Sequence, residues 1–339
     1  MTDRAALATS FLTGTDWAGI APVMLAGDAS NRKYFRLHRA GGGTAVLMDA
    51  DPAKGEDVRP FVRVARHLSA LGLSAPQVYA ADEVSGFLLL EDLGDALFAR
   101  VIPGAPDLEQ TLYTNATDAL ITLHAHPPAP DLKPYDTATM TRMAALAWTW
   151  YRRGALGDDT GIDPFMAQCA SLLDQIAPRA PVMILRDYHA ENLIWLPDRA
   201  GAARTGLLDF QDAMTGHPAY DLVSMLQDAR RDVGSDIERA TIAHYVTRTG
   251  QDAAAFDRAY HLLGAQRNLR ILGVFARLSL HYAKPHYVDL IPRVWGHLDR
   301  CLSHPALAPI AACIRADLPV PTPALLQRLK DLCGTVPML

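Results

Sequence analysis

Two polar segments in the middle of the 339-residue sequence carry acidic residues after short apolar runs. In the first, "ILRDYHAENLIW", Asp187 lies one residue beyond the apolar run and Asn192 follows five positions later. In the second, "GLLDFQDAMTG", Asp209 directly follows two leucines, 17 positions after Asn192. An aspartate at a strand end can accept the proton of a substrate hydroxyl. An amide oxygen and a carboxylate suit Mg²⁺, with waters and phosphate oxygens as further ligands. Base, amide and carboxylate are the working parts of a kinase-type phosphoryl transferase.

The elements expected around these segments divide the chain into a front part with a sheet and a helical remainder. Apolar residues recur at helical spacing in 55–73, and short β-type runs precede and follow this helix. From Asp107 onward the pattern is mostly helical, with two short strands expected in "VMILRD" and "TGLLDF". The expected elements of the front part are a helix and turn in 1–20, strands around 23–26, 34–38 and 44–48, the helix in 55–73, and two strands in 77–94 joined at Ser85–Gly86.

Both polar segments resemble motifs of known kinases. "LRDYHAENLIW" resembles the H-R-D-x-x-x-x-N catalytic loop of protein kinases, with Leu185 in place of the histidine, and "LLDFQD" resembles the D-F-G segment, with Gln211 in place of the glycine. The longer run "DFQDAMTGHPAYDLVSMLQD" is similar to the aminoglycoside phosphotransferase and choline kinase superfamily. Together with "GDASNRKYFRL" and "FLLLEDLG", it is most similar to the anomeric N-acetylmuramate and N-acetylglucosamine kinases of peptidoglycan recycling.

This resemblance implies an α+β, bilobal, protein-kinase-like fold. Residues 1–92 are expected to form a small nucleotide-binding lobe, an antiparallel sheet with one helix, and residues 93–339 a larger, mainly helical lobe. The implied reaction uses ATP and Mg²⁺ and phosphorylates the anomeric hydroxyl of an amino sugar, with Asp187 as the base and Asn192 and Asp209 as metal ligands. Two alternatives stay open: another acceptor, such as an aminoglycoside, choline or a homoserine-like alcohol, and a catalytically inactive binding protein of the same fold.

The nucleotide site departs from the kinase pattern at the lysine of the third strand. "TAVLMDA" places Met48 at that position, and methionine cannot pair with phosphates. The preceding strand supplies three cations, and strand alternation places Arg32 and Arg36 on one face and Lys33 on the other. The choice among these three stays open. The resemblance implies the following nucleotide-binding residues: Asp28 and Ser30 in a loop over the phosphates, Lys33 and Arg36 as cations, Val46 against the adenine, and Glu91 and Leu93 at the hinge.

The acceptor side is less well defined by the sequence. The candidates are His189, Asp212, Tyr151 and Arg230. Asp212 suits a supporting contact to another residue of the site, a contact with a substrate hydroxyl or solvent exposure equally well. Tyr151 belongs to an aromatic group with Trp148 and Trp150 whose near-helical spacing is more typical of a core, although a ring could stack on a sugar. Asp221 is interpreted as a helix cap or a brace for the catalytic loop. A lactyl carboxylate would require a cation, for which Arg152, Arg153, Arg230 and Arg267 are unranked candidates.

Composition excludes several other classes of protein. The formal net charge is −5, so a basic surface for nucleic acid is not expected. The four cysteines show no CxxC pairing, which argues against a zinc site and fits a reducing compartment. No run approaches the ~18 apolar residues of a membrane span, and the first residues lack the apolar core of a signal peptide. We therefore expect a cytoplasmic protein whose partners are ATP and a small-molecule acceptor. The oligomeric state stays open.

Overall fold

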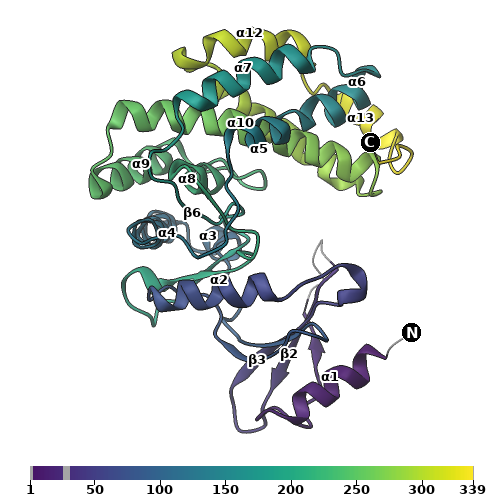
Figure 1. The fold of residues 1–339 in the computed structure, drawn as a ribbon, viewed down its shortest axis with the longest axis vertical. Helices are drawn as coiled ribbons and strands as arrows, with labels where there is room; N and C mark the ends of the chain where they lie inside the picture. Colours follow the sequence, from purple (N-terminus) through teal and green to yellow (C-terminus); the bar gives the residue numbers. More distant parts are fainter. Residues whose placement is uncertain (1–2, 26–30, 339) are drawn as a thin grey trace. The chain divides into compact units, whose positions relative to one another are not determined.

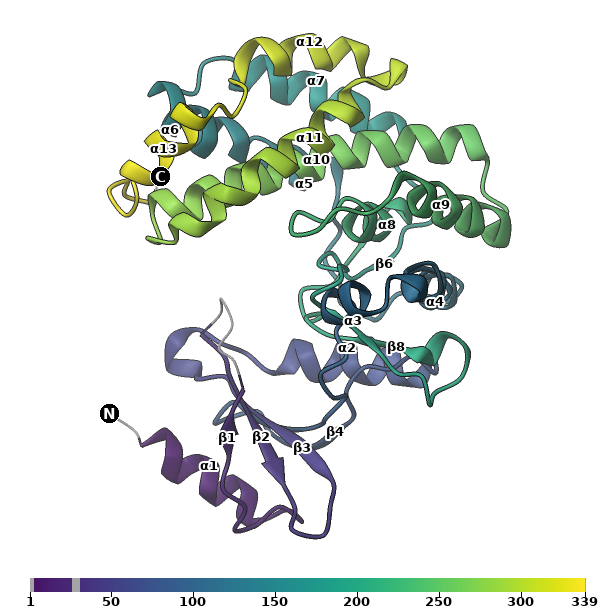
Figure 2. The same cartoon turned by 180° about the vertical axis from the view of Figure 1, so that it is seen from behind.

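The computed structural model describes residues 3–25 and 31–338. The chain forms two compact units, Met1–Asp131 with Ala190–Ala213, and Leu132–His189 with Met214–Leu339. The elements can be followed along the chain in Figure 1 and from behind in Figure 2. The boundary expected at residue 92 does not coincide with this division, because residues 93–131 and 190–213 pack with the sheet-containing unit. As a division of labour between nucleotide and acceptor, that boundary stays a prediction.

The first unit contains an antiparallel five-stranded sheet of order β1-β2-β3-β5-β4, which confirms the predicted β-β-β-α-β-β order.

The turn between β4 and β5 requires a glycine: Gly86 has a φ of 77°, and a Cβ there would lie 2.0 Å from the carbonyl oxygen of Ala50. The elements are α1 (Arg4–Thr13), β1 (Val23–Met24), β2 (Lys33–His38), β3 (Thr44–Asp49), the 3₁₀ turn η1 (Pro52–Lys54), α2 (Arg59–Ala70), β4 (Val78–Asp82) and β5 (Phe87–Glu91).

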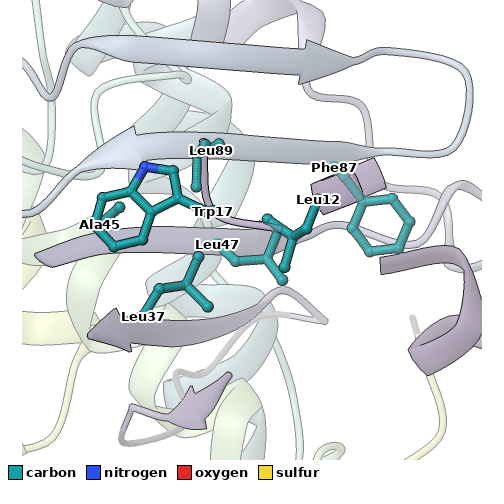
Figure 3. Packing of buried hydrophobic residues seen from close by; sticks show 7 residues of the cluster. All are labelled: Leu12, Trp17, Leu37, Ala45, Leu47, Phe87 and Leu89. Carbon is teal, nitrogen blue, oxygen red and sulfur yellow. The ribbon is translucent and has the colours of Figure 1, made fainter. Parts of the chain in front are cut away.

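The two faces of this sheet carry different residues, because side chains alternate along a strand. One face packs against α1 and the turn that follows it (Figure 3); its buried cluster comprises Leu12, Trp17, Leu37, Ala45, Leu47, Phe87 and Leu89. On the opposite face, Arg36 pairs with Val46 across β2 and β3, and Tyr34 pairs with Met48. Helix α2 lies on this second face in both views (Figures 1 and 2).

The rest of the first unit extends the sheet region with helices and a strand pair. The short strands β7 (Leu193–Trp195) and β8 (Thr205–Leu207) pair antiparallel, and the backbone N–H of Leu207 donates to the carbonyl oxygen of Ser74 at 2.9 Å. The amide of Trp195 likewise donates to Ala96 at 2.8 Å. These bonds tie residues 190–213 to the front of the chain. The further elements are α3 (Phe98–Gly104), η2 (Pro106–Leu108), α4 (Glu109–His124) and η4 (Gly201–Arg204).

The second unit is mainly helical and is built around the 28-residue helix α10 (Ala253–Leu280). Most of its positions are buried, including Gln266, Arg267 and Asn268. Two strands, β6 (Val182–Ile184) and β9 (Met214–Gly216), form an antiparallel pair. The other elements are α5 (Thr137–Ala144), a π-helical turn η3 (Ala147–Arg152), α6 (Arg153–Leu156), α7 (Ile162–Gln175), α8 (Ala219–Leu226), α9 (Ser235–Thr249), η5 (Pro285–Leu290), α11 (Ile291–Leu302), η6 (Pro305–Leu307), α12 (Ala308–Asp317) and α13 (Pro323–Asp331).

The short strands expected in "VMILRD" and "TGLLDF" are confirmed as β6 and β8, whereas β7 and β9 were not predicted. Each of these has three residues, too few to show a period, so only pairing with a distant partner defines it. Within the described part of the chain, none of the helices combines the length and the apolar character that a bilayer span requires.

Candidate active site

The loop after β6 is held in place by a buried carboxylate. Asp221, in the first turn of α8, has no exposed surface and accepts hydrogen bonds from the backbone N–H groups of Leu185 at 2.6 Å and Arg186 at 2.8 Å. Arg186 adopts the left-handed conformation with a φ of 71°, which costs a non-glycine residue energy and persists only where surrounding contacts impose it. Of the two interpretations of Asp221, the structure selects the brace. The carboxylate therefore fixes the backbone that presents Asp187.

The charge environment of Asp187 favours its ionised form. Burial raises the pKa of this carboxyl, but nearby positive charges, above all those of Arg270 and Arg267, outweigh burial and hold the pKa below its ordinary value. Both arginines come from α10. Asp187 is therefore a carboxylate at neutral pH, able to orient a hydroxyl and accept its proton.

Asn192 and Asp209 flank the β7–β8 pair of the first unit. Asn192 precedes β7, Asp209 lies two residues beyond β8, and the N–H of Leu208 donates to the carbonyl oxygen of Asn192 at 2.9 Å. Antiparallel pairing thus brings both residues to the same end of the two strands. Asp209 has a φ of 55°, and Gln211 Nε2 donates to its Oδ1 at 2.8 Å, which orients the carboxylate. An amide oxygen and a half-buried carboxylate at one strand end fit a hard divalent cation.

Phe210 anchors the segment that carries Asp209. Its ring is fully buried and lies 4.8 Å from the ring of Phe61 in α2, centroid to centroid. This aromatic pair joins the acidic segment to the helix on the second face of the sheet.

The predicted nucleotide residues are only partly placed by the structure. Asp28 and Ser30 lie outside the described residues. Val46 is half-buried on the second face of the sheet, and Leu93 is buried. The Glu91 side chain pairs with Arg199, and its backbone N–H donates to the carbonyl oxygen of Gln77 at 2.8 Å. The backbone N–H of Glu91 is therefore already hydrogen-bonded within the chain.

The three candidate cations differ in face and partner. Lys33 begins β2 with its side chain on the α1 face. Arg36 lies on the second face and pairs with Asp92 at 2.7 Å and Asp95 at 2.7 Å; these contacts raise its pKa above the ordinary value, with the Asp95 hydrogen bond as the largest cause. Arg32 precedes β2, and alternation places it on the second face, where its Nε donates to Glu56 at 2.9 Å. Arg32 is thus a cation paired with a glutamate just before α2.

The acceptor candidates do not form one group. His189 is buried close to Asp187, whereas Asp212 and Arg230 are exposed. The Tyr151 ring is fully buried in the second unit, and its hydroxyl donates to the carbonyl oxygen of Pro319 at 2.7 Å. With Trp148 and Trp150 also buried, the core interpretation of this aromatic group is confirmed.

Sequence reasoning did not single out Asp228 or Arg270, and it named Arg267 only among several unranked arginines. A signal was present in "GAQRNLRILGVFA", where two arginines three positions apart lie in a mostly apolar helical segment. Charged side chains in such a helix are buried and require partners. In the structure those partners include Asp187.

Comparison with known proteins adds to this geometry. The model of the "Phosphotransferase enzyme family" matches residues 23–272. A Caulobacter vibrioides protein named N-acetylmuramate/N-acetylglucosamine kinase is 39% identical over 359 aligned positions, covering 94% of this chain and 98% of its own length. A Pseudomonas aeruginosa protein of the same name is 33% identical, covering 89% of this chain and 91% of its own.

Solved structures are similar in fold at low sequence identity. A choline/ethanolamine kinase family protein from Mesorhizobium loti has a TM-score of 0.61 at 14% identity, covering 93% of this chain and all of its own. An aminoglycoside phosphotransferase from Streptomyces rimosus, in complex with ADP and streptomycin, has a TM-score of 0.51 at 20% identity, covering 80% of this chain and 99% of its own. These similarities confirm the predicted kinase-like fold.

Proposed function

Since the chain belongs to the phosphotransferase enzyme family, we propose that it transfers the γ-phosphoryl group of ATP to the anomeric hydroxyl of N-acetylmuramate and N-acetylglucosamine. The family resemblance inferred from the sequence is confirmed. The observation that supports the transfer is the braced loop, in which Asp221 holds the backbone before an ionised Asp187. The acceptor follows from the names of relatives that align along nearly the whole chain.

Deprotonation of this acceptor hydroxyl requires only a weak base. An anomeric hydroxyl is more acidic than an ordinary sugar alcohol, so a carboxylate of low pKa suffices to orient it and take its proton. The hydroxyl oxygen forms a bond to the γ-phosphorus, and the bond from this phosphorus to the β–γ bridging oxygen breaks and releases ADP. Catalysis of phosphoryl transfer depends mainly on positioning and charge neutralisation. The rigid backbone at Leu185 and Arg186 serves the first of these.

Asn192 and Asp209 would hold Mg²⁺, and Gln211 keeps the carboxylate in place. When bound, the ion supplies positive charge to the phosphate oxygens of ATP. Arg32 replaces the lysine of the third strand in this proposal. Its pairing with Glu56 parallels the lysine–glutamate pair that kinases use beside the phosphates.

The test is turnover with ATP against N-acetylmuramate, N-acetylglucosamine and kanamycin, with ³¹P and ¹H NMR of the product. We expect both amino sugars to be phosphorylated, with the phosphorus coupled to the anomeric proton, and no product from kanamycin. A C6 phosphate, or turnover with kanamycin alone, would exclude the sugar assignment and leave a phosphotransferase with another acceptor. The absence of ATP turnover with every acceptor would favour the inactive binding protein.

A further inference from the structure

Several buried polar residues of the second unit present atoms without hydrogen-bond partners in the described part of the chain, among them His189, Asp228 and Arg267. These three come from three separate segments: His189 from the loop after β6, Asp228 from the segment after α8, and Arg267 from α10. The atoms are Nδ1 of His189, Oδ2 of Asp228, and Nε and Nη1 of Arg267. The residues are 8%, 1% and 3% exposed. Buried polar groups are nearly always paired, so each such atom requires an explanation.

These three residues lie close enough to interact electrostatically with one another. The charges of Asp187, Asp228 and Arg267 all act on His189, and those of Asp187 and Asp228 act on Arg267. Burial lowers the pKa of His189 to about 4, so its ring is neutral at pH 7 and can both donate and accept a hydrogen bond. The cluster therefore lies beside the proposed base.

The remaining atoms of Arg267 and Asp228 are held by protein contacts. Arg267 Nη2 donates to Ser224 Oγ at 2.8 Å, and Asp228 Oδ1 accepts from the N–H of Arg230 at 2.8 Å. Each side chain is thus oriented by one contact and leaves a further polar atom unmatched. A fixed donor and a fixed acceptor together form a defined recognition element.

The unmatched donor atoms of Arg267 and the unmatched acceptor atom of Asp228 indicate which chemical group of a ligand would pair with them. A carboxylate would match Arg267 but would leave the Asp228 oxygen unpaired and repelled. A secondary amide matches both, since its carbonyl oxygen accepts and its N–H donates. In the proposed acceptors the acetamido group is on C2, the carbon next to the reacting C1, so residues that bind it must lie next to the base.

We propose that Arg267 and Asp228 bind the acetamido group of the acceptor, with Arg267 donating to its carbonyl oxygen and Asp228 accepting from its N–H. His189 supplies an adjacent hydrogen bond to a sugar hydroxyl. This inference rests on the proposed function and adds to it the residues that select an N-acetylated sugar.

The test is the isosteric variant Asp228→Asn, assayed with N-acetylglucosamine, N-acetylmuramate and glucose. Because the Arg230 N–H holds the Oδ1 position, the asparagine carbonyl takes that place and its NH₂ then faces the acetamido N–H. We expect kcat/KM for both N-acetyl sugars to fall about 10- to 100-fold, with little change for glucose. The matched control is Asp232→Asn, an exposed carboxylate paired with Arg293, which is expected to leave all three values unchanged.

An unreactive probe separates binding from chemistry. The 1,5-anhydro analogue of N-acetylglucosamine lacks the anomeric hydroxyl, and calorimetry should show that Asp228→Asn and Arg267→Lys weaken its binding but not that of 1,5-anhydroglucitol. Loss with N-acetylmuramate alone would instead indicate a site for its carboxylate and would overturn the inference, as would equal loss with all three sugars or no loss. If the wild-type chain phosphorylates neither N-acetyl sugar, the proposed function itself fails.

Discussion

At the scale of single residues, the role of Asp187 depends on its neighbours in α10. Their positive charge lowers the pKa of its carboxyl below the ordinary value despite burial. A lowered pKa keeps the base deprotonated down to acidic pH. We therefore expect kcat/KM to show no acid limb from this group between about pH 5 and pH 9.

Replacing Asp187 with Asn removes the charge and keeps the shape. We expect kcat to fall by roughly 10²- to 10⁴-fold, the range for loss of a general base. Affinity for Mg·ATP should change little, because Asp187 is not one of the proposed metal ligands. Steady-state kinetics and nucleotide titration measure both quantities, and a variant that keeps more than about a third of wild-type kcat would remove Asp187 from this role.

The two proposed metal ligands should differ in strength. Asp209 contributes a full charge, so Asp209→Ala should abolish Mg-dependent tight binding of the nucleotide. Asn192→Ala should raise the Mg²⁺ requirement less, because water more easily replaces a neutral amide oxygen. Titration of Mg²⁺ in turnover assays gives the order. The reverse order would contradict the assignment.

The cation that replaces the third-strand lysine can be identified by single substitutions. We expect Arg32→Met to raise KM for ATP and lower kcat, each by about 10-fold, because the transferred phosphoryl group needs a nearby positive charge. Lys33→Met is the control, since Lys33 lies on the α1 face of the sheet. If Lys33→Met has the larger effect, or neither variant has one, the assignment of Arg32 is wrong.

At the scale of elements, the position of α10 depends on close backbone contact. A Cβ at Gly273 would lie 2.3 Å from the carbonyl carbon and oxygen of Leu146, which are backbone atoms that cannot rotate away. Helix α10 can therefore approach the π-helical turn η3 only where a glycine stands. The same helix carries Arg267 and Arg270, so this contact also fixes the positions of both arginines.

A matched pair of glycine substitutions tests this contact. We expect Gly273→Ala to lower the free energy of unfolding by about 1–3 kcal/mol through overpacking. Gly296→Ala in α11 meets nothing within 4 Å and should raise it by about 0.5–1 kcal/mol through helix propensity. Urea denaturation measures the free energy of unfolding of both variants. An increase for Gly273→Ala would show that η3 moves to accommodate the added methyl group.

At the scale of the whole molecule, the first unit is discontinuous in sequence. Residues 190–213 bring β7, β8 and the proposed metal ligands to a unit whose other part ends at Asp131. Ser74 bonds to Leu207, and Ala96 to Trp195, across this gap.

A fragment of residues 1–131 therefore lacks part of its own core. We expect it to show no cooperative urea transition, whereas the full chain unfolds cooperatively, because the segment that packs against Phe61 and bonds to Ser74 and Ala96 is missing. Far- and near-ultraviolet circular dichroism measure this. Coincident sigmoidal transitions in the fragment would show that residues 190–213 are dispensable for folding.

Local sequence patterns determined much of this protein. The strand and helix order of the front part, the core role of Trp148 and Tyr151, and the choice of the catalytic candidates all rest on short-range patterns. Such patterns are readable because periodicity and turn residues act within a few positions. Asp187, Asn192 and Asp209 remain the proposed site residues.

Only the tertiary structure decided which distant residues act together. The spacing of Asp221 allowed a cap or a brace, and its contacts with Leu185 and Arg186 selected the brace. The sequence left Arg267 as one of several candidate cations, and the structure shows that it is buried near Asp187 and Asp228. The physical reason is that a charged side chain can be buried only where partners neutralise it. Here those partners lie tens of residues away in sequence, so local patterns do not reveal them.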